Sequence, residues 1–307
     1  MPPRPNLFIV GAMKSGTTSL HSYLQVHPQI FMSQSKEPAY FVDELNWKRG
    51  EDWYLGLFRD AGDAEVVGES STDYTKYPTY RDVAQRIARF NPAARFIYIM
   101  RDPVERTIGH YWHAVRGRDR FGRERRDLLA AIRENPHYRD VSHYAMQLEQ
   151  YVRIFGRDRI LAVTFEEMNA RPEVFTQSIF RWLGVDGSFT PPNLDERSNV
   201  TPKVVRRIRG WGLLNRFRHT RLWNAVGPQI SPSLRRVGRR LATDRVDRTR
   251  HATADAIAYL QSMQVEQTRQ LSELLGREFA EWKTVHGQAA DVRSAAASPR
   301  AGAAVAR

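Results

Sequence analysis

Short apolar runs that alternate with amphipathic stretches constrain the fold of this chain more than any other feature. The clearest runs are residues 7–10 (Leu-Phe-Ile-Val) and 96–100 (Phe-Ile-Tyr-Ile-Met), and each stops abruptly at a glycine or a charged residue. Runs this short that are apolar throughout are typical of parallel strands buried on both faces. We expect two further strands, at residues 66–67 and 160–165.

The stretches between these runs have the apolar spacing of helices. Helices are predicted at 17–25, 80–90, 103–115, 144–155 and 173–183. A strand that is repeatedly followed by a helix indicates an α/β fold, with a mostly parallel central sheet flanked by helices. We expect this core to occupy residues 1–185.

The chain changes character after the core. Residues 186–287 are expected to form a basic, mainly helical C-terminal part that packs on the core, with one long helix at 251–282. The alanine-rich residues 288–307 are expected to be disordered. The net charge of the 307-residue chain is +13, and residues 201–250 alone hold 14 Lys or Arg against two Asp. The positive charge is therefore concentrated in residues 201–250, which we call the cationic element.

Three interpretations of this cationic element stay open, because Trp211, Phe217 and Trp223 lie among its arginines. It is a helical cap with solvated arginines, or it contacts an anionic membrane or an anionic or lipid-linked acceptor, or it binds nucleic acid. Because the rest of the chain is nearly neutral, no nucleic-acid partner is expected.

Composition excludes several classes of chemistry. The chain has no cysteine, which rules out disulfides, thiolate metal sites and a cysteine nucleophile. It contains no apolar run near the roughly 20 residues of a membrane span, and its first residues do not resemble a secretory signal. A cytoplasmic location, at most peripheral to a membrane, is the expectation.

Residues 11–19, which we call the phosphate loop, begin with Gly-Ala-Met-Lys-Ser-Gly-Thr-Thr between a strand and a helix. Glycines let the backbone turn tightly and approach an anion, and the amides of the next helix can then bind it. Lys14 adds a positive charge. Hydroxyls come from Ser15, Thr17, Thr18 and Ser19. The simpler alternative is a strand, turn and helix with a capping hydroxyl.

The position of the lysine distinguishes this loop from the Walker pattern, in which lysine directly follows the second glycine. Here Lys14 lies two positions before Gly16. A kinase or NTPase with a displaced loop lysine is therefore one hypothesis, and a non-catalytic module that binds anions or membranes is another.

The loop between its strand and helix resembles the 5′-phosphosulfate loop of sulfotransferases that use 3′-phosphoadenosine 5′-phosphosulfate (PAPS). Further segments resemble motifs of the heparan-sulfate-type enzymes in the expected order. They are residues 36–41 (KEPxFF), 50–58 (GxxWY…F), 68–74 (GExSPxYF) and 99–111 (the 3′-phosphate motif RDPxxRxxSxY). The resemblance covers about residues 6–185 and implies a PAPS-binding catalytic core with the P-loop sulfotransferase fold.

This resemblance assigns the donor contacts. It implies that PAPS is bound at its 5′ end by Lys14, Ser15, Gly16, Thr17, Thr18 and Ser19, and at its 3′-phosphate by Arg101. An ion pair between Arg101 and a neighbouring carboxylate is the alternative. The family's second 3′-phosphate contact, a serine, falls at Gly109, so a hydroxyl is missing there. The Gly109 amide, Thr107 or water would substitute, or donor affinity is weaker.

The same resemblance implies a catalytic pair without a metal. A sulfuryl group carries less charge than a phosphoryl group, so electrostatic positioning suffices. The acceptor hydroxyl must lose a proton, and the resemblance gives the role of general base to Glu37. Lys14 would stabilise the leaving oxygen. The alternatives are a Lys36–Glu37 surface pair and a histidine base; the available histidines are His27, His110, His113 and His143.

Acceptor contacts are expected from the remaining motif residues. Lys36 would act at the sulfuryl group or the acceptor, and four further residues would line the acceptor site: Asp43, Ser70, Asp73 and Tyr74. The expected acceptor is a hydroxyl of a small molecule such as a natural product, of a sugar or glycan, or of a lipid.

Overall fold

The computed structural model describes residues 2–196, 204–208, 243–247 and 254–287. Its central sheet has five strands in the order β2-β3-β1-β4-β5, and all neighbouring pairs are parallel. The strands are β1 (Leu7–Gly11), β2 (Ile30–Met32), β3 (Val66–Ser70), β4 (Arg95–Met100) and β5 (Ile160–Thr164). The parallel α/β core is thereby confirmed. Strand β2 was not predicted, because three residues are too few to show a pattern.

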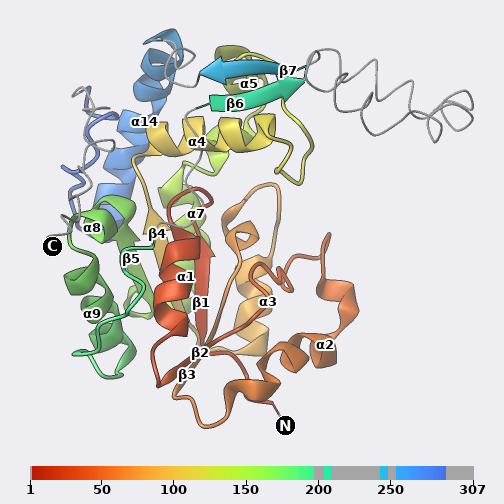
Figure 1. The fold of residues 1–307 in the computed structure, drawn as a ribbon, viewed down its shortest axis with the longest axis vertical. Helices are drawn as coiled ribbons and strands as arrows, with labels where there is room; N and C mark the ends of the chain where they lie inside the picture. Colours follow the sequence, from red (N-terminus) through yellow and green to blue (C-terminus); the bar gives the residue numbers. More distant parts are fainter. Residues whose placement is uncertain (1, 197–203, 209–242, 248–253, 288–307) are drawn as a thin grey trace, which may run out of the picture.

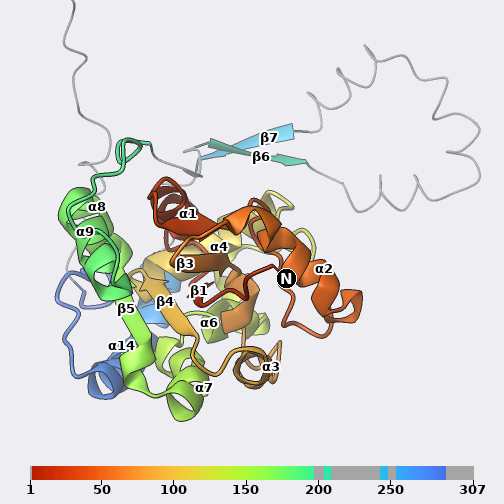
Figure 2. The ribbon, with the colours of Figure 1, turned by 90° about the horizontal axis from the view of Figure 1, so that it is seen from below.

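The sheet is buried on both faces, which explains the unbroken apolar runs. Along β1, Leu7 and Ile9 pack on one side while Phe8 and Val10 pack on the other. Figures 1 and 2 show the resulting layers. One face is covered by α1 (Thr17–Gln25), α8 (Phe165–Ala170) and α9 (Pro172–Leu183), and the other by α3 (Val83–Phe90), α7 (Tyr144–Phe155) and α14 (Ala254–Leu275).

The helix α4 (Pro103–Val115) lies across the carboxyl ends of the central strands (Figure 1). It begins at Pro103 as the sequence predicts, because proline suits the first helical position. The shorter helices were not all predicted, since one or two turns show little periodicity. They are α2 (Glu51–Leu55), α5 (Leu128–Glu134) and α6 (His137–Asp140), with 3-10 turns at Trp47–Arg49, Gly56–Ala61, Thr72–Thr75 and Arg157–Arg159.

The C-terminal part is only partly helical in the described residues. Helix α14 falls inside the predicted helix at 251–282. However, β6 (Val204–Ile208) pairs antiparallel with β7 (Thr243–Asp247), which departs from the mainly helical structure predicted for residues 186–287. A pair separated by more than thirty residues is set by tertiary contacts that local pattern does not encode. Most of the cationic element and residues 288–307 lie outside the described residues.

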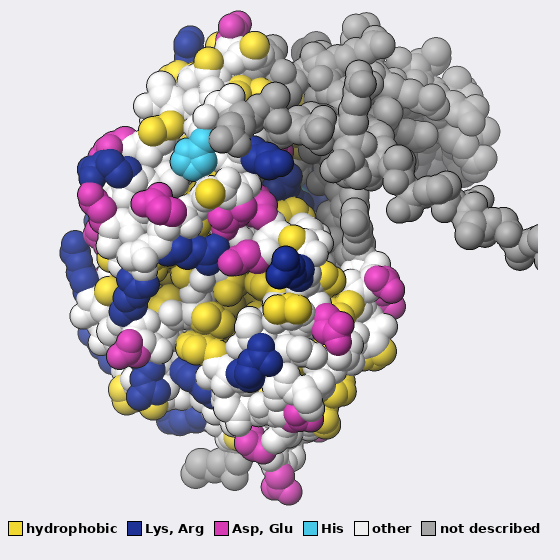
Figure 3. All heavy atoms as spheres, turned by 90° about the vertical axis from the view of Figure 1, so that its left-hand side faces the viewer, with side chains coloured by type: hydrophobic (Ala, Val, Ile, Leu, Met, Phe, Trp, Pro, Cys, Tyr) yellow, Lys and Arg dark blue, Asp and Glu magenta, His cyan; other side chains and the backbone are white. Residues whose placement is uncertain are grey.

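Two surface features of the described residues bear on location and charge. No helix among them is long and apolar enough to cross a membrane. Figure 3 shows the face formed by α8, α9 and α14, on which basic and acidic side chains are intermixed. This mixture agrees with a net charge that is concentrated in residues 201–250.

Candidate active site

The carboxyl ends of β1, β3 and β4 meet at the middle of the sheet, where parallel α/β folds bind their ligands. The Ser71 amide donates to the Ile9 carbonyl (3.0 Å), and the Ala12 amide to the Ile99 carbonyl (2.6 Å). These bonds extend the strand pairing into the loops that follow. Three of the motif regions that hold predicted site residues, 11–19, 68–74 and 99–111, therefore lie at adjacent strand ends.

Close packing around the phosphate loop requires glycine at two positions. A Cβ on Gly11 would overlap the Thr75 hydroxyl, and one on Gly16 would lie 2.7 Å from the Met168 Cε. Gly16 also has φ of 95°, in the left-handed region that favours glycine. The loop is thus fitted between the turn after β3 and helix α8.

The phosphate loop also has features that suit an anion. The Ser15 hydroxyl is fully buried near Tyr144, and no described residue lies in good hydrogen-bonding geometry with it. A buried polar group without a partner is unfavourable, and an anion oxygen would satisfy it. Lys14 adopts a left-handed backbone, with φ of 72°, and Thr17 opens α1, whose first amides face the loop. The residues present therefore fit a phosphosulfate group.

One face of α4 is directed at the phosphate loop. A Cβ on Gly109 would lie 3.7 Å from the Lys14 Cβ. His113, one turn further along α4, also lies near Lys14; burial and this lysine lower the His113 pKa to about 4. Position 109 is thus on the side of α4 that faces the phosphate loop, and its contact with a 3′-phosphate stays a prediction.

Arg101 follows β4 at the same edge. Its guanidinium is 3.3 Å from the Glu105 carboxylate and 5.1 Å from the centre of the Phe165 ring. The ion pair that we considered as an alternative is present. However, both side chains are about one third exposed, and such pairs contribute little. A phosphate could compete with Glu105 for this guanidinium.

Asp102, the acidic residue after β4, is engaged by four main-chain amides. Its Oδ1 accepts from Val104 and Glu105 in the first turn of α4, and its Oδ2 accepts from Thr284 and Val285 near the C-terminus. Burial raises its pKa. Both carboxylate oxygens of Asp102 are therefore occupied by main-chain amides.

Glu37 is held at the carboxyl end of β3. Its amide donates to the Ser70 carbonyl (2.9 Å), and its Oε2 accepts from the Thr72 amide (2.7 Å) and hydroxyl (3.2 Å). Its Oε1 lies 2.5 Å from the Lys36 ammonium, so the expected alternative pair exists too. The turn that begins at Thr72 reaches β1 through Thr75, whose hydroxyl donates to the Val10 carbonyl (2.6 Å). Glu37 and the phosphate loop thus occupy neighbouring strand ends.

The candidate acceptor residues differ in their surroundings. Asp73 is buried and pairs with Lys76 (2.6 Å) and Arg120 (2.9 Å). Tyr74 is buried, and its hydroxyl donates to Glu69, inside the core. The Ser70 hydroxyl hydrogen-bonds to His21 (2.9 Å), whereas Asp43 is exposed. Their contact with an acceptor stays a prediction.

The alternative histidine bases have contacts of their own. His110 is fully buried between Asp119 (2.6 Å from its Nε2) and Arg106 (3.3 Å from its Nδ1). Burial lowers its pKa to about 3, so it is neutral, with Nδ1 accepting from Arg106. His27 bonds to the Asp186 carbonyl, and His143 bonds to the side-chain oxygen of Gln270. Of the four candidate histidine bases, His113 is the one that lies near Lys14.

Three residues near these strand ends had no assigned role at the sequence level. They are His21, Glu69 and Lys76, all of which are buried. Glu69 stands in the GExSPxYF motif, which was a usable signal. The partner of His21 is set by packing and has no signature in the sequence, whereas Lys76 lies only three residues after its partner Asp73.

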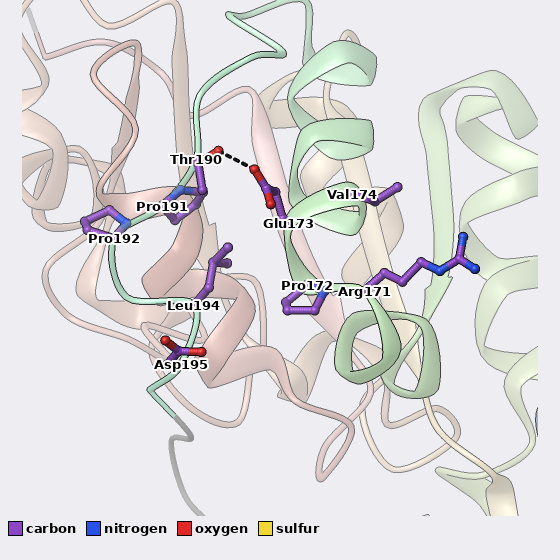
Figure 4. Close-up of a pocket in the computed structure, with 9 residues that line it drawn as sticks. All are labelled: Arg171, Pro172, Glu173, Val174, Thr190, Pro191, Pro192, Leu194 and Asp195. Atoms are coloured by element: carbon purple, nitrogen blue, oxygen red, sulfur yellow. Dashed lines mark hydrogen bonds between the residues drawn. The ribbon is translucent and has the colours of Figure 1, made fainter. Parts of the chain in front are cut away.

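A pocket of about 460 Å³ lies elsewhere, between the first turn of α9 and the segment 190–195 (Figure 4). The Thr190 hydroxyl donates to the Glu173 carboxylate (2.8 Å) across it. No motif residue lines this pocket. Within the described ranges, no three His, Asp or Glu side chains are placed to hold a metal ion.

Comparisons with known proteins agree with the motifs. A profile of the sulfotransferase family matches residues 39–191. A solved sulfotransferase from Alicyclobacillus acidocaldarius is similar over 91% of this chain and 99% of its own, with a TM-score of 0.64 and 26% identity. The chain belongs to the sulfotransferase family. It is therefore a member of an enzyme family, with the α/β fold predicted from its motifs.

Curated relatives of this sulfotransferase include enzymes named for heparan sulfate. The human bifunctional heparan sulfate N-deacetylase/N-sulfotransferase 2 is 28% identical over 200 residues, which is 59% of this chain and 22% of that protein. The mouse heparan sulfate glucosamine 3-O-sulfotransferase 5 is 24% identical over 198 residues, 62% of this chain and 56% of that protein. The chain thus spans about a fifth of the former and just over half of the latter.

Proposed function

We propose that this sulfotransferase moves the sulfuryl group of PAPS to a hydroxyl of a sugar, lipid or natural product. One observation carries the proposal. The phosphate loop lies between Glu37, held at the end of β3, and the edge formed by Arg101 and the Gly109 side of α4. A donor whose phosphosulfate sits in the loop would have a carboxylate on one side and a cation for its 3′-phosphate on the other.

The proposed step is an in-line displacement at sulfur. The acceptor oxygen forms a bond to sulfur while the bond from sulfur to the phosphate oxygen breaks, and the acceptor proton passes to the Glu37 carboxylate. Lys14 stabilises the charge that develops on the leaving phosphate oxygen. Thr72 and Lys36 fix the Glu37 carboxylate for this role.

A sugar hydroxyl is the first acceptor class to test, because relatives are named for heparan sulfate. We propose the cationic element, residues 201–250, as the part that would meet an anionic or lipid-linked acceptor or a membrane surface. A cytoplasmic location is proposed on composition alone.

The deciding experiment combines nucleotide binding with a transfer assay. Adenosine 3′,5′-bisphosphate, the desulfated donor, should raise the melting temperature, and ³⁵S from labelled PAPS should appear in at least one of a panel of sugar, lipid and phenolic acceptors. The proposal would be wrong if Mg-ATP stabilised the protein and the bisphosphate did not. That result would favour the displaced-lysine kinase hypothesis.

A further inference from the structure

The loop that carries Glu37 has an unfavourable backbone. Glu37 has φ of 61° and Ala39 has φ of 47°, both in the left-handed region that residues other than glycine rarely adopt. Such a backbone is unfavourable and persists only where surrounding contacts enforce it. The contacts that enforce this loop therefore control where the proposed base lies.

The residue at the centre of these contacts is Glu69. It is the penultimate residue of β3, is fully buried, and accepts three short hydrogen bonds from uncharged hydroxyls. Its Oε1 accepts from Tyr54 (2.6 Å) and Tyr74 (2.7 Å), and its Oε2 accepts from Ser71 (2.6 Å). An ionised carboxylate matches three donors, because it accepts at both oxygens and donates at neither.

Two of the three hydroxyls also accept hydrogen bonds from the loop that carries Glu37. The Ser71 hydroxyl accepts from the Ala39 amide (2.9 Å), and the Tyr74 hydroxyl accepts from the Phe41 amide (3.4 Å). A hydroxyl has one hydrogen, so donating it to Glu69 leaves only lone pairs for these amides. Glu69 therefore orients both acceptors that hold the backbone after Glu37.

The third hydroxyl connects Glu69 to the loop by ring packing. The Tyr54 ring is stacked on that of Tyr40, with centroids 4.4 Å apart and an interplanar angle of 11°. Burying a carboxylate among neutral groups is unfavourable, and burial raises the Glu69 pKa to about 7. An apolar side chain would avoid this cost but could not orient the hydroxyls.

We propose that Glu69 is a positioning residue, which sets the geometry of Glu37 through the Ser71 and Tyr74 hydroxyls. This inference rests on the proposed function, because it concerns the same proton transfer. Glu69 directly precedes Ser70, whose carbonyl accepts from the Glu37 amide, and it would act through the hydroxyls rather than on the reacting groups.

The test is a double-mutant cycle on turnover with Glu37→Gln and Glu69→Gln. Glu69→Gln alone should lower kcat about 10- to 100-fold, as a misplaced catalytic group does. The affinity for adenosine 3′,5′-bisphosphate should stay within about twofold of wild type, because the donor site is untouched. In the Glu37→Gln background, Glu69→Gln should add little further loss. Glu65→Gln, an exposed residue just before β3, is the matched control.

Ser71→Ala provides a second variant should Glu69→Gln fail to fold. It deletes the hydroxyl between Glu69 and the Ala39 amide, and it should lower kcat in the same way and speed hydrogen exchange at Ala39. Turnover near wild type in either folded variant, or losses that add to that of Glu37→Gln, would overturn the inference. A wild-type protein that neither binds the bisphosphate nor transfers sulfur would overturn the proposed function, and this inference with it.

Discussion

At the scale of single residues, Glu37 carries the most specific prediction. Glu37→Gln keeps the shape of the side chain and its contacts to Thr72 but removes the basic oxygen. We expect kcat to fall by roughly 10²- to 10⁴-fold, the usual contribution of a general base, with bisphosphate binding retained. Steady-state turnover and isothermal titration calorimetry would measure the two quantities.

A histidine base would give the opposite pattern. His113 lies near Lys14, so His113→Asn is the matched comparison. If that variant lost turnover while Glu37→Gln kept it, the assignment of the base would move to α4. If neither variant lost turnover, the non-catalytic hypothesis would gain support.

Gly109 permits a gain-of-function prediction. A serine Cβ fits there at an ordinary contact distance of 3.7 Å from Lys14, so Gly109→Ser would restore the family hydroxyl without a clash. We expect bisphosphate affinity to rise by about tenfold, as for one hydrogen bond to a charged group. Gly109→Ala is the control. Both variants should raise the free energy of unfolding by about 0.5 kcal/mol or more, because serine and alanine favour a helix over glycine. Only Gly109→Ser should bind the bisphosphate more tightly. Equal affinities of the two variants would argue against a 3′-phosphate at this position.

At the scale of elements, the start of α4 and the C-terminal segment depend on the same carboxylate. Asp102 caps α4 and binds the amides of Thr284 and Val285, which lie 182 and 183 residues away in sequence. This long-range link attaches the segment after α14 to the strand end that carries Arg101. Together with the buried Phe279, Trp282 and Val285, it holds this part of the chain on the core.

Asp102→Ala should therefore lower the free energy of unfolding by more than the loss of a helix cap does. Loss of a cap costs about 1 kcal/mol, and each buried amide left without a partner adds about 1–3 kcal/mol. We expect a loss of about 3 kcal/mol or more in the free energy of unfolding, measured with urea. Asp127→Ala, which removes the exposed cap of α5, should cost only about 1 kcal/mol. Equal losses would mean that Asp102 acts as a cap alone.

At the scale of the whole molecule, buried histidines should make stability depend on pH. Burial lowers the pKa of His21, His113 and His137 to about 4 and that of His110 to about 3. Below pH 6.5 the unfolded chain binds protons at these rings, and the folded protein does not. Their contribution to stability is therefore complete above pH 6.5 and is lost as the pH falls toward 4.

Two buried carboxyls act in the opposite direction. Burial raises the pKa of Glu69 and of Glu166 to about 7, so in the interval from pH 7 to 4.5 the folded protein binds protons that the unfolded chain does not. Burial also raises the pKa of Asp102 and Asp140, but from the lower starting value of an aspartate, so the four histidines outweigh the carboxyls in this interval. We therefore expect the free energy of unfolding to decrease from pH 6.5 to 5, with net proton uptake on unfolding, which calorimetry in two buffers can measure. Stability that is flat or rises over this interval would contradict the expectation.

Much of the fold and of the candidate site was predictable because the signals were local. Buried parallel strands require unbroken apolar runs, and the residues that follow them meet at one edge of the sheet. The phosphate loop after β1, the segment 68–74 at the end of β3 and Arg101 after β4 could thus be placed at one edge of the sheet, whereas their roles there follow from the family resemblance. Strand β2 and the short helices lacked enough residues for such a signal.

The sequence by itself determined the layered α/β core, the family and the edge of the sheet that holds the motifs, since each follows from periodicity or from a contiguous motif. Only the tertiary structure decided the partners of those residues. Tyr54 on Glu69, Arg120 on Asp73, and the amides of Thr284 and Val285 on Asp102 come from segments outside the motifs that they contact. Such side-chain contacts depend on how whole elements pack, and no local pattern encodes that packing.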